Sequence, residues 1–123
     1  MGNSRLAREY DKRAKELGSD YYSPMTIGNY HKLKAILDKR GIAYVCMQYP
    51  MRSIESLKKI FGGKKGIIFV DNEKIFKDAL RNASYKEYFR DIFGGDFGHC
   101  TKKGNRLLAE NIANTILKEV FGK

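Results

Sequence analysis

The sequence is poor in several residue types, and each shortage excludes a class of protein. Its 123 residues include no Trp, two Pro and two Cys, and its main apolar run, residues 42–49, is only as long as a strand. A disulfide scaffold needs more cysteines, and a transmembrane helix needs about 20 consecutive apolar residues. The first residues contain no apolar segment typical of a secretory signal. We therefore expect a cytoplasmic protein with reduced thiols and no membrane span.

Acidic residues are also scarce, with 14 Asp and Glu against 24 Lys and Arg and a net charge of +10. The excess is concentrated in residues 31–65, which hold nine basic and two acidic side chains. Such a stretch can bind a polyanion such as nucleic acid or an acidic polysaccharide. No aromatic residues are interleaved with these lysines as stacking platforms, and no nucleic-acid-binding motif is present. A solvated helix face is therefore favoured over a nucleic-acid site, and polyanion binding remains an alternative.

Hydrophobic periodicity predicts an α/β fold with the element order α-α-β-α-β-α-α-α. The expected helices are residues 5–17, 24–40, 54–61, 75–80, 84–93 and 102–120, and the expected strands are 42–49 and 66–70. The unbroken apolar character of the first strand indicates that both of its faces are buried, as in a parallel sheet. The helix between the strands predicts a right-handed crossover.

Two strands are few for an open parallel sheet, which normally has four or more. We expect residues 1–123 to form a single domain whose sheet is completed from outside. The completing strands would come from a homo-oligomer or a partner chain, or the chain is the C-terminal part of a larger fold.

The loop at residues 94–100 carries the most informative pair of polar side chains. Ligand sites in open α/β sheets lie beyond the carboxyl ends of the strands, and this loop is one of three segments that could reach that edge. Asp96 precedes His99 by three residues among Gly94, Gly95 and Gly98, which permit a tight turn. The carboxylate could orient the imidazole and stabilise its protonated form. The simpler interpretation is that Asp96 caps a turn and His99 is a surface residue.

The surroundings of this pair resemble a known family. Residues 96–113, D-F-G-H-C-T-K-K-G-N-R-L-L-A-E-N-I-A, are similar to the last conserved block of the SGNH (GDSL) hydrolases. The resemblance covers residues 20–121 and implies the C-terminal half of a flavodoxin-like three-layer fold, with a short parallel sheet of about two strands between helices. It implies hydrolysis of a small or carbohydrate-linked ester, with His99 as general base and Asp96 as the carboxylate that orients it.

The family's other blocks are missing from this sequence. It contains neither a Gly-Asp-Ser nor a Gly-x-Asn-Asp segment, and Met-Gly-Asn-Ser at residues 1–4 is the only similar fragment. By the resemblance Asn3 would be the oxyanion donor, whereas Ser4 has no preceding strand to hold it as a nucleophile. We therefore expect no activity from the chain alone unless a second chain supplies the serine. The alternative is a non-catalytic module that pairs through an exposed strand edge.

Other reactive groups are weaker candidates. Cys100 could replace the serine, but side chains of adjacent loop residues such as His99 and Cys100 usually diverge. Asp71 lies on a different loop from Asp96 and His99, and the three lack the spacing of metal ligands, so no metal is expected. No cofactor is predicted either.

Overall fold

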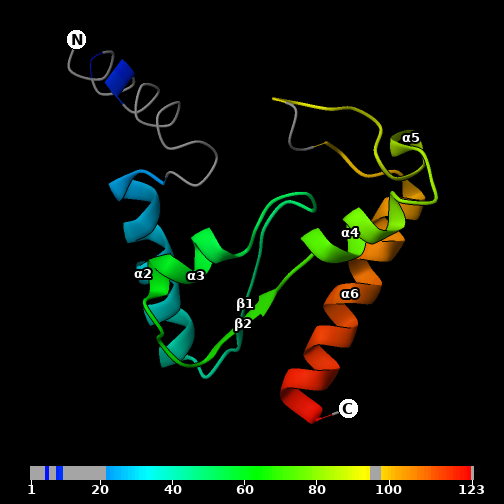
Figure 1. Cartoon of the computed structure of the whole chain (residues 1–123). Helices are drawn as coiled ribbons and strands as arrows, with labels where there is room; N and C mark the ends of the chain where they lie inside the picture. Colours follow the sequence, from blue (N-terminus) through cyan, green and yellow to red (C-terminus); the bar gives the residue numbers. More distant parts are fainter. Residues whose placement is uncertain (1–4, 6–7, 10–21, 95–97, 123) are drawn as a thin grey trace. The chain divides into compact units, whose positions relative to one another are not determined.

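The computed structural model describes residues 5, 8–9, 22–94 and 98–122. The chain divides into two compact units, Met1–Ile42 and Ala43–Lys123, and each is described by itself (Figure 1). Within the described ranges no helix has both the length and the apolar character needed to cross a bilayer.

The described core of the first unit is helix α2, Pro24–Lys39. Its start follows from the sequence, because Ser23 Oγ accepts a hydrogen bond from the Thr26 backbone N–H at 3.2 Å and Pro24 occupies the first turn. Gly41, with φ of 65°, turns the chain away after the last residues of the helix. The predicted helix at 24–40 is confirmed. The one predicted at residues 5–17 lies largely outside the described residues.

The second unit is built on a parallel strand pair. Strand β1 (Tyr44–Met47) is followed by helix α3 (Glu55–Phe61) and strand β2 (Ile67–Val70). Tyr44 pairs with Ile67, and the register continues to the last residue of each strand. The mixed α/β character and the two-stranded parallel sheet are therefore as predicted, although both strands are shorter than expected.

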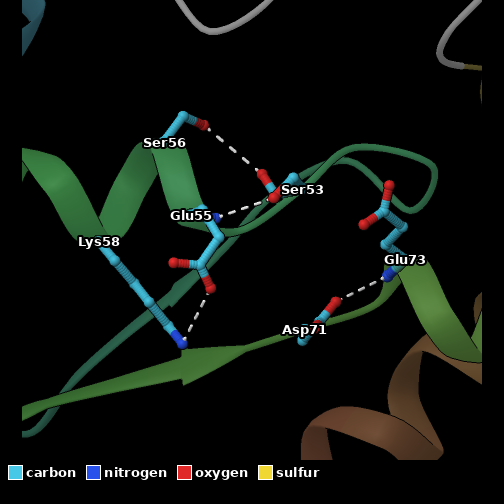
Figure 2. Close-up of polar contacts among 6 residues, drawn as sticks. All are labelled: Ser53, Glu55, Ser56, Lys58, Asp71 and Glu73. Atoms are coloured by element: carbon cyan, nitrogen blue, oxygen red, sulfur yellow. Dashed lines mark hydrogen bonds and ion pairs between the residues drawn. The ribbon is translucent and has the colours of Figure 1, made fainter.

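Side-chain oxygens mark the passage from strand ends into helices (Figure 2). Ser53 Oγ accepts the Glu55 backbone N–H at 3.2 Å at the start of α3. Asp71 Oδ1 does the same for the Glu73 backbone N–H at 3.1 Å at the start of helix α4, Glu73–Ala79. Each oxygen thus satisfies an N–H that has no acceptor within its helix.

The sheet is not buried evenly on its two faces. Tyr44 and Cys46 are buried on the face that α3 covers, where the Phe61 ring lies 5.7 Å from that of Tyr44. On the other face Val45 and Met47 are 37% and 47% exposed. The prediction that the first strand is buried on both faces is therefore wrong. Helix α6 packs against β2. The second unit is shown in Figure 1.

Helix α5 is much shorter than predicted. It spans Tyr85–Tyr88, whereas the periodicity predicted a helix through residue 93. Phe89 has extended backbone instead and forms an antiparallel bridge with Cys100. Its fully buried ring packs 5.5 Å from that of Phe76 on α4. The aromatic residues that looked like one helical stripe thus belong to a helix followed by an extended segment.

Helix α6, Lys102–Phe121, begins as predicted but buries a different set of residues. Thr101 is the N-cap, because its Oγ1 accepts the Gly104 backbone N–H at 3.2 Å. The buried positions are Gly104 and Asn111, not the stripe that helical periodicity predicts, namely Leu107, Leu108, Ile112, Ala113, Ile116, Leu117 and Val120. Of that predicted stripe, Leu117 and Val120 are exposed.

Candidate active site

The loop that contains His99 is closed at its base by the backbone. Phe89 and Cys100 form the bridge, the Arg90 N–H donates to the His99 carbonyl at 2.7 Å, and the Thr101 N–H donates to the Tyr88 carbonyl at 3.0 Å. These bonds bring residues nine to thirteen positions apart in the sequence side by side. The start of the loop therefore faces its end, a proximity that a helix through residue 93 would not allow.

Asp91 holds His99 by two hydrogen bonds. The His99 backbone N–H donates to Asp91 Oδ1 at 2.7 Å, and His99 Nδ1 lies 2.8 Å from Asp91 Oδ2. An ionised carboxylate can only accept, so this contact places the ring proton on Nδ1 and leaves Nε2 as an acceptor. The Phe93 ring meets the imidazole edge-on, with centroids 5.6 Å apart.

Both side chains of the Asp91–His99 dyad are accessible to solvent. The His99 side chain is 70% exposed and that of Asp91 is 38% exposed. The pKa of Asp91 lies below its ordinary value of 3.8, first because the His99 backbone N–H donates to the carboxylate and then through the ring contact, with partial desolvation opposing the shift. Asp91 is therefore ionised at neutral pH and oriented toward the imidazole.

Gly98 fits into this loop because of close contact with the backbone. A Cβ at position 98 would collide with the Asp91 carbonyl oxygen and the Tyr85 hydroxyl, which donates to that same carbonyl at 2.7 Å. A positive φ is found instead at Gly94, where it is 58°. The expected freedom of turn angles thus applies to Gly94, whereas Gly98 is needed for space.

Of the three predicted catalytic residues, only His99 is among the residues that the structure describes. His99 lies in the dyad, whereas Asp96 and Asn3 are outside the described residues. Asp91, which sequence reasoning missed, is the carboxylate that binds His99. Asp91 stands eight positions before His99, inside a segment predicted as helix, so no spacing rule connects the two. Only the antiparallel bridge could have revealed the contact.

The other reactive groups are engaged in structural roles. Burial raises the pKa of the Cys100 thiol, so the thiolate that a nucleophile requires is disfavoured. The Arg52 guanidinium lies 6.0 Å from the Tyr49 ring centroid, and Asp71 binds the start of α4. Within the described residues no group of three or more metal-ligating side chains forms.

A buried asparagine pair joins α6 to the carboxyl ends of both strands. Asn111 Nδ2 donates to Asn72 Oδ1 at 2.8 Å and to the Asp71 carbonyl at 2.9 Å. Asn72 Nδ2 in turn donates to the Gln48 carbonyl, just after β1, at 3.4 Å. Since α6 begins nine residues before Asn111 and rises 1.5 Å per residue, the start of α6, which closely follows His99 in the sequence, lies about 14 Å from Asn111.

Comparisons of the chain with protein-family models, with curated proteins and with solved structures find no match. The functional argument therefore depends on the dyad itself. A carboxylate bonded to Nδ1 of an imidazole whose side chain is largely exposed is the arrangement that a general base requires.

Proposed function

We propose that this chain carries the general-base half of an ester hydrolase, with His99 Nε2 as the base and Asp91 as the carboxylate that orients it. The observation that carries the proposal is the double contact of one carboxylate with both the backbone N–H and the ring Nδ1 of His99. The contact sets the tautomer and fixes the ring. The carboxylate would also stabilise the imidazolium that forms when Nε2 takes a proton.

The nucleophile is not provided by the groups next to His99. In the described part of the chain no serine hydroxyl bonds to the imidazole, and the neighbouring Cys100 thiol is kept protonated by burial. We propose that a second polypeptide supplies the serine and further strands, so that the parallel pair becomes part of an SGNH-type, flavodoxin-like sheet. The substrate would be a small or carbohydrate-linked ester.

An activated ester tests the base without the missing serine, because an oriented imidazole can act on p-nitrophenyl acetate directly or through water. Ordinary esters should stay intact without the serine, whereas this activated ester should be hydrolysed above the buffer rate, and His99→Ala should lower the protein-dependent rate by about tenfold or more. The other histidine of the chain supplies the control, and His31→Ala should keep the rate. Equal rates for wild type and His99→Ala would sink the proposal.

A further inference from the structure

Tyr85 connects the hydrophobic core of the second unit to the dyad. Its ring stacks on the Phe89 ring, with centroids 4.7 Å apart and an angle of 21° between the planes. The Phe89 ring is fully buried and lies 5.5 Å from that of Phe76, which is fully buried as well. Because protein interiors are closely packed, a ring held in such a stack keeps its orientation. The stack therefore fixes the direction in which the Tyr85 hydroxyl points.

The Tyr85 hydroxyl contacts both sides of the loop that contains His99. It donates a hydrogen bond to the Asp91 backbone carbonyl at 2.7 Å. A Cβ at position 98 would lie 2.6 Å from the same hydroxyl, so the backbone of Gly98 packs directly against it. Asp91 is itself a dyad residue, and Gly98 immediately precedes His99. One hydroxyl thus fixes the spacing of the two backbone segments from which the dyad side chains extend.

The hydroxyl binds the backbone of Asp91 and not its carboxylate. The carboxylate accepts from the backbone N–H of His99 at 2.7 Å and lies 2.8 Å from the ring Nδ1. Both contacts start from one short side chain, so their lengths depend on the position of the Asp91 backbone. A displacement of that backbone by about 1 Å would lengthen both contacts beyond the range of good hydrogen bonds.

Stacking accounts for an aromatic residue at position 85 but not for a tyrosine. A phenylalanine would stack on Phe89 equally well, because the ring contact needs no polar atom. A hydroxyl that leaves water requires a hydrogen-bond partner, and here the partner is the Asp91 carbonyl. Desolvation and then the nearby Asp91 charge raise the pKa of Tyr85 above its ordinary value of 10.0, so the hydroxyl remains a donor at neutral pH.

We propose that Tyr85 is a positioning residue of the dyad, whose hydroxyl holds the Asp91 backbone where the carboxylate can orient His99. Its effect on catalysis rests on the proposed function, because Tyr85 acts on the base only through Asp91. Its effect on the position of Asp91 requires no activity and can be measured separately. The conservative variant Tyr85→Phe removes the hydroxyl and keeps the ring stack.

The first measurement follows the carboxylate without catalysis. The NMR shift of the His99 amide proton reports the titration of Asp91, whose pKa is lowered first by the hydrogen bond from that amide. In Tyr85→Phe the midpoint should move up toward the ordinary value of 3.8, because the contact loosens. The charged groups that act on the carboxylate, His99 and Arg90, remain in this variant, so the shift reports the position of Asp91.

Tyr88 on the same helix supplies the matched control. Its hydroxyl interacts with Lys103 instead, so Tyr88→Phe should titrate as wild type does. Equal midpoints for wild type and Tyr85→Phe, with both variants folded by circular dichroism, would overturn the proposal. Failure of Tyr85→Phe to fold would also overturn it, because the hydroxyl would then be needed for the whole fold rather than for the dyad.

The second measurement is a double-mutant cycle on the hydrolysis of p-nitrophenyl acetate. Tyr85→Phe should lower the His99-dependent rate about fivefold, which corresponds to about 1 kcal/mol, the contribution of one neutral hydrogen bond. Combined with Asp91→Ala it should have no further effect, because the carboxylate through which Tyr85 acts is then absent. Losses that multiply in the double variant would contradict the proposal. If wild type shows no His99-dependent hydrolysis, the proposed function fails, whereas the amide titration still decides the role of Tyr85.

Discussion

The two ends of the short sheet are built by different means. Beyond the carboxyl ends, buried amides of Asn72 and Asn111 and the dyad of Asp91 and His99 are held by directed hydrogen bonds. At the amino end of β2 the loop of residues 62–66 consists of three glycines and the exposed Lys64 and Lys65. The energy of a hydrogen bond is lost when its one partner is removed. The electrostatic effect of exposed charges, by contrast, changes only in proportion to the number of charges removed. Single substitutions should therefore damage the first end far more than the second.

The largest effect is expected from the ring that supports the loop of the dyad. Phe89 is 1% exposed and stacks on Tyr85 with centroids 4.7 Å apart, so Phe89→Ala should lower the free energy of unfolding by about 3–5 kcal/mol. Phe93, which is 46% exposed, is the matched control, and Phe93→Ala should cost about 0.5 kcal/mol. Urea denaturation followed by circular dichroism measures both.

Similar losses for the two phenylalanines would show that Phe89 does not anchor the loop in solution. If Phe89→Ala does not fold, Phe89→Leu keeps much of the volume and should give a smaller loss in the same direction.

A smaller loss is expected from the asparagine pair. Asn111→Ala leaves Asn72 Oδ1 and the Asp71 carbonyl without their donor, which should cost about 1–3 kcal/mol of unfolding free energy. Asn114, exposed on the same helix, is the control. Asn114→Ala should be neutral or slightly stabilising because alanine is the better helix former. An Asn111 variant as stable as wild type would mean that water replaces the lost bonds.

The smallest effect on stability is expected from protonation of the Asp91 carboxylate at low pH. Because the pKa of Asp91 is lowered in the folded chain, its contribution to stability is complete above the ordinary value of 3.8 and disappears as the pH falls through the lowered value. The NMR shift of the His99 amide proton, bonded to Asp91 Oδ1, should therefore titrate with a midpoint below 3.8.

Two conservative variants separate the candidate carboxylates in this titration. Asp91→Asn should abolish the acid transition of the His99 amide, and Asp96→Asn should leave it in place. A transition that depends on Asp96 instead would assign the orienting role to the D-x-x-H residue that the family resemblance indicates. A midpoint above 3.8 would contradict the contact with Asp91.

Local signals predicted the elements whose ends depend on neighbouring residues. Ser23 and Pro24 begin α2, Thr101 begins α6, and Gly62 ends α3, each through contacts or backbone angles within a few positions. The prediction of one helix over residues 84–93 was wrong, because the aromatic residues have helical spacing but Phe89 is in an extended segment. Phe89 leaves the helix because its backbone pairs with Cys100, a contact between distant residues.

The sequence by itself determined the caps, the order of helices and strands, the parallel character of the pair and the candidacy of His99. These depend on periodicity, on turn residues and on one short motif. Only the tertiary structure decided which carboxylate binds His99, why position 98 must be glycine, and that Asn111 rather than the leucines of α6 is buried. The reason is that each of these depends on the approach of segments that no local spacing brings together.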